Sequence, residues 1–200
     1  YKLLNKEEYL KSREFLYENN GISFYSDKNK KIFFDIVQPN KDKISSNLSA
    51  GTLSLEFSSG EEKIITNCGA SESYGKNPEY LRYSAAHSTV ILQNTNISEI
   101  KENNPHIKFP QSVTFNFEKN HSETIFEGSH NGYVKKFGKI VKRKLMLSEK
   151  LNKIIGEDSI ISIKKNENRT IFHIRFHLED GISFNFSNSK KNLILKTKKN

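Results

Sequence analysis

The chain has 200 residues, enough for one large domain or two small ones with a buried core. Its hydrophobic content of 34% comes in short regular runs, which excludes a disordered chain, and no run approaches the roughly 20 residues of a membrane helix. The net charge of +9 would attract polyanions, but no zinc-finger spacing or ribonucleoprotein signature accompanies it, so nucleic acid is not an expected partner.

The chain begins at Tyr1 rather than Met, and we expect it to be a fragment of a longer protein. Residues 5–17 predict a short amphipathic helix, because apolar side chains recur at helical spacing and Asn5 can cap the first turn. Gly21 ends this pattern, and extended runs divided by turn residues follow it. The single Cys68 excludes an internal disulfide and a cysteine-based zinc site.

Two hairpins open the extended part of the sequence. The runs 22–25 and 31–37 flank a polar turn, and the run 52–57 alternates so that Leu53, Leu55 and Phe57 share one face. Residues 58–61 then turn the chain, and 63–66 return. Later strands are expected at 88–92, 112–117, 122–126, 140–147, 159–164, 170–178, 182–186 and 193–197. About a dozen short strands with polar turns predict a mainly β fold, a large antiparallel β-sandwich preceded by the short N-terminal helix.

Two segments do not fit the strand pattern. Residues 67–86 form a long connection rich in Gly, Ser and Tyr, and long structured loops of this kind often carry function. Residues 99–110 are expected to be irregular, because Pro105 and Pro110 interrupt them.

Three blocks of sequence occur in a recognisable order. The first is 49–57 with 64–69, the second is Arg82-Tyr-Ser-Ala-Ala-His-Ser-Thr-Val90, and the third is 128–133 followed by 142–145, 156–158 and 175–178. Together they cover about residues 20–185 and resemble the heparinase II/III-like family.

That resemblance implies a large β-sandwich, or supersandwich, preceded by an α/α toroid of helices. Residues 1–20 would be a linker or helix from the missing toroid, and residues 21–200 the sandwich. The resemblance also implies a lyase that cleaves acidic, uronic-acid polysaccharide by β-elimination in the periplasm or envelope of a Gram-negative bacterium. The alternative is a non-catalytic carbohydrate-binding or envelope-associated module that has kept the fold.

The resemblance bears on the metal as well. Family members carry a His-x-His-Ala-Asp segment before the first strand, in which one histidine acts in catalysis and the other binds zinc. Asn47 and Ser49 stand at those places here, Asn67 stands where the next ligand is an Asp, and His87 alone remains. One histidine with an amide and a hydroxyl is a poor zinc set, so we expect no metal and no other cofactor.

His87 is the candidate catalytic residue, because it ends the long loop and its side chain titrates near neutrality. The alternative is a buried histidine whose ring nitrogens bond backbone groups. Arg82 is a candidate for binding a uronate carboxylate, although a local acid such as Glu79 is the more ordinary partner. Tyr83 and Asn67 are further candidates for substrate binding.

His130 and Tyr133 flank the Asn131-Gly132 pair, which predicts a hairpin turn, and are kept as substrate-binding candidates with a structural role favoured. His173, Arg175 and His177 would share one strand face, either as a basic stripe or as an ordinary solvated face. The densest basic patch consists of Lys135-Lys136 and Lys142-Arg-Lys144. Lys142 and Lys144 would share one strand face, with Val141 and Leu145 on the other, either as a polyanion site or, as we favour, as the ordinary charged outside of a strand.

Overall fold

The computed structural model describes residues 15–19, 21–27, 29–39, 48–68, 79–101, 104–148, 152–163 and 169–197. The fold is mainly β, as predicted. The strands are β1 (Phe15–Asn19), β2 (Ile22–Ser26), β3 (Lys30–Asp35), β4 (Leu55–Ser59), β5 (Glu62–Thr66), β6 (Val90–Leu92), β7 (Glu99–Lys101), β8 (Asn104–Lys108), β9 (Val113–Lys119), β10 (Glu123–His130), β11 (Lys139–Ser148), β12 (Lys153–Ser162), β13 (Phe172–Ile174), β14 (His177–Leu178), β15 (Ser183–Phe186) and β16 (Leu193–Lys196). The helical turns described are η3 (Glu79–Arg82), η4 (Ser84–Ala86) and α2 (Val134–Phe137).

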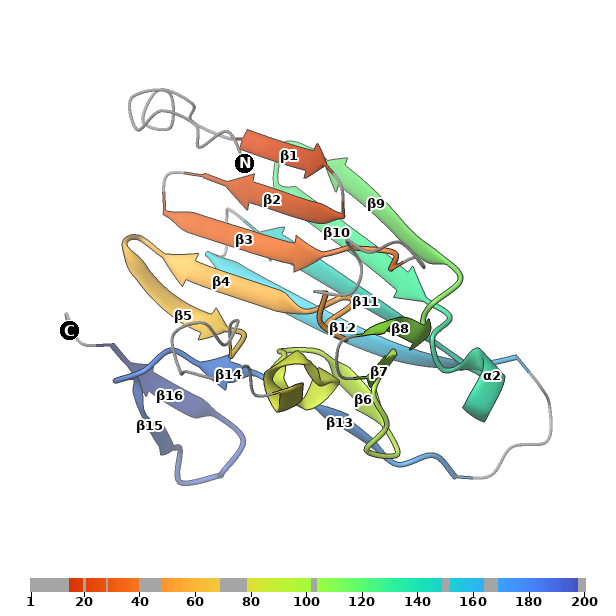
Figure 1. Cartoon of the computed structure of the whole chain (residues 1–200). Helices are drawn as coiled ribbons and strands as arrows, with labels where there is room; N and C mark the ends of the chain where they lie inside the picture. Colours follow the sequence, from red (N-terminus) through yellow and green to blue (C-terminus); the bar gives the residue numbers. More distant parts are fainter. Residues whose placement is uncertain are drawn as a thin grey trace.

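Two antiparallel sheets form the body of the molecule (Figure 1). The six-stranded sheet has the order β1-β2-β3-β4-β5-β14, and the four-stranded sheet behind it has the order β12-β11-β10-β9. Three two-stranded pairs, β6 with β13, β7 with β8 and β15 with β16, complete the described strands. The arrangement is the antiparallel sandwich expected from the alternating sequence.

The main core lies between the two large sheets. Strand β10 alternates buried and half-buried residues along its whole length, so one face is turned to the core. The buried side chains are Tyr25, Ile32, Phe34, Leu53, Leu55, Phe126, Leu145 and Leu147. A second core cluster consists of Val90, Leu92, Ile97, Tyr133 and Val141. It joins β6 to β11.

The expected hairpin at the start of the β region is confirmed, since β2 and β3 pair with Phe24 opposite Phe33. The expected strand at 52–57 begins later, at Leu55. Leu53 has φ 61, a left-handed conformation that interrupts extended backbone, and the Ser54 N–H donates to the Gly51 carbonyl at 2.7 Å. Leu53 is nevertheless buried. The alternating pattern therefore predicted the core position of its side chain correctly, although residue 53 lies in a turn and not in a strand.

The helix expected at residues 5–17 is not formed by those of its residues that the structure describes. Residues 5–14 lie outside the described residues, and residues 15–17 belong to β1, which pairs antiparallel with β2. Pairing with β2 gives the backbone groups of residues 15–17 their hydrogen-bond partners. The short helical spacing of apolar residues in the sequence is too weak a signal to predict helix here. The six-stranded sheet therefore includes residues before position 21, where we expected the sandwich to begin.

Three further expectations are corrected. The run 170–178 is two strands in different sheets, because β13 pairs with β6 and β14 pairs with β5. The Asn131-Gly132 pair does not close a tight hairpin, since α2 lies between β10 and β11. The segment 99–110 contains the paired strands β7 and β8. Within the described residues, no helix has both the length and the apolar character needed to cross a membrane.

Candidate functional site

Two of the sequence blocks that resemble the family, 49–57 with 64–69 and 82–90, meet at the six-stranded sheet. The segment before β6 lies against the segment before β4, because the Leu55 N–H donates to the Ser88 carbonyl at 3.2 Å. It also lies against the end of β5, where the Cys68 N–H donates to the Ala86 carbonyl at 2.9 Å. These backbone bonds bring together three segments that are far apart in the sequence and that carry Ser49, Asn67 and His87.

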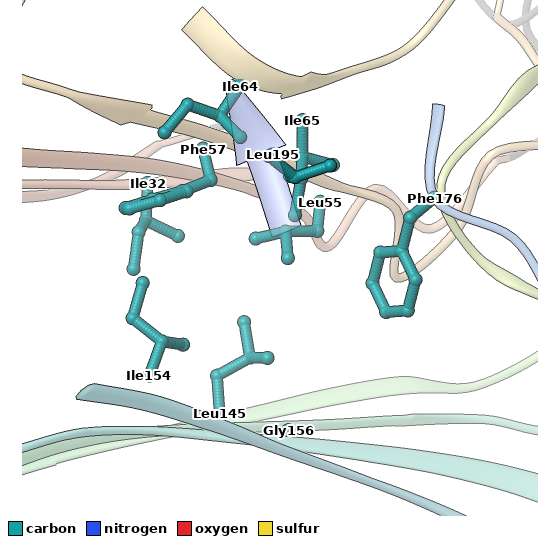
Figure 2. A pocket seen from close by; sticks show the side chains of 10 residues that line it. All are labelled: Ile32, Leu55, Phe57, Ile64, Ile65, Leu145, Ile154, Gly156, Phe176 and Leu195. Atoms are coloured by element: carbon teal, nitrogen blue, oxygen red, sulfur yellow. The ribbon is translucent and has the colours of Figure 1, made fainter. Parts of the chain in front are cut away.

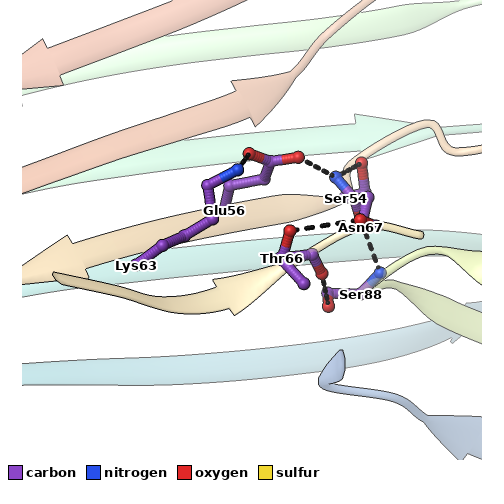
Figure 3. Close-up of polar contacts among 6 residues, drawn as sticks. All are labelled: Ser54, Glu56, Lys63, Thr66, Asn67 and Ser88. Atoms are coloured by element: carbon purple, nitrogen blue, oxygen red, sulfur yellow. Dashed lines mark hydrogen bonds and ion pairs between the residues drawn. The ribbon is translucent and has the colours of Figure 1, made fainter. Parts of the chain in front are cut away.

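Asn67 is the centre of a polar network in this region (Figure 3). Its Nδ2 donates to Ser54 Oγ at 3.4 Å and to Glu56 Oε1 at 3.2 Å, and its Oδ1 accepts from the Ser88 N–H at 2.8 Å. Glu56 in turn lies 3.6 Å from Lys63 Nζ. The amide is suited to this place because it donates on one side and accepts on the other, which a carboxylate cannot do.

His87 is buried, with 6% of its surface exposed. One face of its ring packs on Gly51, where an added Cβ would lie 3.0 Å from Cγ. The ring hydrogen-bonds to the backbone of Leu81, but Nε2 has no hydrogen-bond partner within the described part of the chain.

Burial, and secondarily the charge of His177, lowers the pKa of His87 to about 4. The imidazole is therefore neutral at pH 7. Since the Leu81 contact occupies the other ring nitrogen, the unpaired Nε2 is the acceptor nitrogen of the ring. Buried polar atoms are normally paired, and Nε2 is itself buried, so a ligand could bond it only after the groups around the ring move.

His177 lies beside this site rather than on a stripe with His173. Its Nδ1 is 3.6 Å from Cys68 Sγ, and its Nε2 is 2.9 Å from the Ala85 carbonyl. The His173 side chain is exposed on β13, in a different sheet. The basic stripe, one of the two alternatives, is therefore not formed, because the chain changes sheets between the two histidines.

Arg82 is turned towards the backbone of the site. Its Nε and Nη2 both donate to the Leu48 carbonyl, at 3.2 and 2.9 Å, and its own carbonyl accepts from the Ala50 N–H at 2.8 Å. The Glu79 side chain, its expected partner, lies outside the described residues. Tyr83 is half-buried and directly precedes η4. Arg82 thus holds the segment that carries Ser49.

His130 and Tyr133 lie in the interior, each with 1% of its surface exposed. His130 Nδ1 accepts from the Gly132 N–H at 3.2 Å, and the Tyr133 hydroxyl donates to the Thr95 carbonyl at 2.8 Å. Burial, and secondarily the charge of Arg143, lowers the pKa of His130 to about 3, and burial raises the pKa of Tyr133. This placement fits the structural role that we favoured, and it separates both residues from the surface.

The zinc site implied by the resemblance does not fit the residues present. Asn47 lies outside the described residues, and the Asn67 amide is already bonded on both sides by Ser54, Glu56 and Ser88. Across the described ranges, no group of three His, Cys, Asp or Glu side chains is placed to hold a metal ion. We therefore derive no step that passes through a metal.

Two residues of the region were missed from the sequence. The sequence predicts Glu56 only as part of a strand, and Arg143 only as part of a basic patch. Arg143 is in fact 2% exposed, whereas its neighbour Lys142 points outward to Glu127 at 2.8 Å. The signal was available, because the alternation that buries Val141 and Leu145 also turns residue 143 inward.

A cavity of about 380 Å³ lies between the two large sheets (Figure 2). Its lining consists of Ile32, Leu55, Phe57, Ile64, Ile65, Leu145, Ile154, Gly156, Phe176 and Leu195. No side chain of that lining is charged or can transfer a proton. The cavity therefore belongs to the packing of the sandwich and not to the candidate site.

Comparison with known proteins gives the family of the chain. A search among curated proteins found no match. The model of the heparinase II/III-like family, C-terminal, matches residues 11–200, which include β1 and every later strand. The chain therefore belongs to the heparinase II/III-like family, and it corresponds to the C-terminal part of its members.

Proposed function

We propose that this chain is the C-terminal sandwich of a polysaccharide lyase that cleaves uronic-acid polysaccharide by β-elimination. The observation that carries the proposal is the neutral, buried His87 with an unpaired Nε2, in the block that resembles the family's Ala-Ala-His-Ser-Thr signature. The family match over residues 11–200 supports the class of protein, and the net charge of +9 suits an acidic polymer.

The elimination needs three things: a base that removes the proton at C5, neutralisation of the uronate carboxylate, and an acid that assists departure of the O4 leaving group. His87 suits the role of a hydrogen-bond acceptor better than that of a strong base, because its pKa is low. We assign to it the orientation of the sugar or the relay of a proton. The remaining groups would come from the helical domain that the family places before this one.

The test uses the full-length protein with a panel of uronic-acid polysaccharides, and follows the ultraviolet absorbance of the unsaturated uronate product. The decisive variant is His87→Gln, which keeps a polar side chain but removes the imidazole. The matched control is His173→Gln, since that histidine is exposed on β13. We expect product from the wild type and the control, and a loss of about a hundredfold in His87→Gln, as for loss of a group that orients the substrate or relays a proton. No product on any polymer would refute the lyase proposal.

A second candidate function is a non-catalytic carbohydrate-binding module. It is favoured by Asn67, whose amide is committed to Ser54, Glu56 and Ser88 where family members carry a metal-binding acid. Under this alternative the same polymers would bind without any unsaturated product. A folded His87→Ala variant that loses turnover would exclude it.

The proposed place of action is the periplasm or the cell envelope of a Gram-negative bacterium. Fractionation of cells that express the full-length gene tests this, and recovery of the protein only from the cytoplasm would contradict it.

A further inference from the structure

Arg143 lies on the inner face of β11, and its neighbours across the sheet are Gly128 on β10 and Asp158 on β12. Its Nε donates to Asp158 Oδ1 at 2.7 Å, and its Nη2 donates to Asp158 Oδ2 at 2.9 Å. This paired contact fixes the plane of the guanidinium group. It leaves the third nitrogen, Nη1, to serve other partners.

Nη1 reaches two backbone carbonyls outside its own sheet. It donates to the Leu53 carbonyl at 3.0 Å and to the Ser88 carbonyl at 2.7 Å. Leu53 belongs to the turn before β4, and Ser88 belongs to the segment before β6. One buried cation therefore ties together two of the three segments that form the candidate site.

Gly128 makes this approach possible. A Cβ at that position would lie 2.5 Å from Leu53 Cδ2 and 2.9 Å from Phe34 Cε1, which no side chain tolerates without a shift. Because glycine leaves this space open, the Leu53 turn packs directly on β10, next to Arg143. The turn is thus held on one side by packing and at its carbonyl by Nη1.

Both segments held by Nη1 contact the His87 ring or adjoin it. Gly51 opens the turn and lies under the imidazole, where an added Cβ would lie 3.0 Å from Cγ and 3.1 Å from Nδ1. Ser88 is the next residue in the chain, and its carbonyl also accepts from the Leu55 N–H. A displacement of either segment would therefore move the imidazole.

We propose that Arg143, held by Asp158, is a positioning residue that fixes the Gly51–Ser54 turn against the His87–Ser88 segment and so sets the place of the His87 ring. The contacts of Arg143 with Asp158, Leu53 and Ser88, called the Arg143 clamp below, do not depend on any reaction. Their effect on turnover rests on the proposed lyase function. Arginine is specified because a lysine has no planar fork with which to serve a carboxylate and two carbonyls at once.

The test compares Arg143→Lys and Asp158→Asn in the full-length protein, with Lys142→Met as the control that removes the outward-pointing neighbour. Hydrogen–deuterium exchange is measured in peptides that contain residues 51–55 and 86–89, with the β2–β3 hairpin as the internal reference. We expect exchange in the two site peptides to rise about tenfold in both variants, in proportion to the loss of one or two hydrogen bonds, with the hairpin and the control unchanged.

Turnover is the second measurement. A displaced ring should lower kcat by about tenfold or more while KM changes by less than about threefold, because the loss concerns orientation in the transition state rather than binding. Gly51→Ala, which presses on the ring from the other side, should lower kcat in the same way with exchange at 86–89 unchanged. Agreement between these variants supports a positioning role over a general loss of structure.

Unchanged exchange at 51–55 and 86–89 in a folded Arg143→Lys or Asp158→Asn protein overturns the proposal, whatever the activity. Faster exchange with an unchanged kcat overturns the link to His87. If the wild type yields no product on any polymer, the lyase proposal fails, but the exchange experiment still decides whether the clamp exists. If Arg143→Lys does not fold, Asp158→Asn decides the question.

Discussion

Asn67 Nδ2 lies 3.2 Å from Glu56 Oε1, so a neutral amide bonds a carboxylate at the place where family members carry an acid. The pairing explains why an amide suits this chain: an aspartate would set two carboxylates side by side. It also shows how the site differs from a metal site, because Glu56 is occupied by Asn67 and Lys63.

The variant Asn67→Asp should destabilise the protein at pH 7 by about 1–3 kcal/mol, since it removes two donated hydrogen bonds and adds a like charge beside Glu56. The cost should shrink towards pH 4, where a protonated carboxyl can donate again. Urea unfolding at the two pH values measures the difference. Asn185→Asp, on the exposed strand β15, is the control and should change stability little. An equal cost at both pH values would contradict the explanation.

The ion pair of Arg143 and Asp158 should show strong coupling. Asp158→Leu alone leaves a buried cation without its partner and is expected to cost about 3–5 kcal/mol. The double variant Arg143→Met with Asp158→Leu should recover part of this loss, because no unpaired charge remains. It should not recover all of it, since the Leu53 and Ser88 carbonyls still lose the hydrogen bonds donated by Nη1.

A double-mutant cycle from denaturant unfolding gives the coupling energy. Costs that simply add would mean that the two side chains act independently, against the geometry of the pair.

Much of the sandwich could be predicted because its signals are local. The β2–β3 hairpin follows from short apolar runs on both sides of a polar turn, and the structure confirms it. The run at 52–57 alternated equally well, yet Leu53 takes a left-handed conformation that no local pattern demands. Its conformation is stabilised by long-range contacts with Gly128 and Arg143, which a single sequence does not reveal.

The site shows the same division. His87 and Asn67 were found because they lie in blocks that resemble the family, but the partners of Asn67 come from other segments. Arg143 was grouped with Lys142 and Lys144 in one basic patch, although arginine and lysine differ in the face they occupy here. In a strand, residue 143 lies on the same face as Val141 and Leu145, which are buried. This alternation was the better guide to the place of Arg143 than its charge.

His130 should make the protein less stable in acid. Its pKa is about 3 in the folded state against about 6.5 unfolded, so between these values the unfolded chain binds a proton that the folded chain excludes. The free energy of unfolding is unaffected by this group above pH 6.5. It falls as the pH drops from 6.5 towards 3, and the loss is complete once the pH has passed below 3. The slope should be about 1.4 kcal/mol per pH unit for this one group.

Comparison of the wild type with His130→Gln isolates that slope. Asp35, whose pKa burial raises to about 6, changes stability in the opposite direction, but it does so in both proteins and cancels in the difference. Unfolding free energies measured from pH 7 to pH 4 should converge as the pH falls. Parallel curves would show that His130 is protonated at no cost in the folded protein.

Gly128→Ala tests how closely the site turn packs on β10. The new methyl group would lie 2.5 Å from Leu53 Cδ2 and 2.9 Å from Phe34 Cε1, so we expect a loss of about 1–3 kcal/mol from overpacking. Gly156→Ala is the matched control: it also lies in a strand of the same sheet, and its methyl group would meet Leu145 Cδ2 at an ordinary 3.6 Å. Thermal unfolding of both variants should show a lowered midpoint only for Gly128→Ala. Equal midpoints would mean that the turn yields easily, and Arg143 would then have to hold it without help from packing.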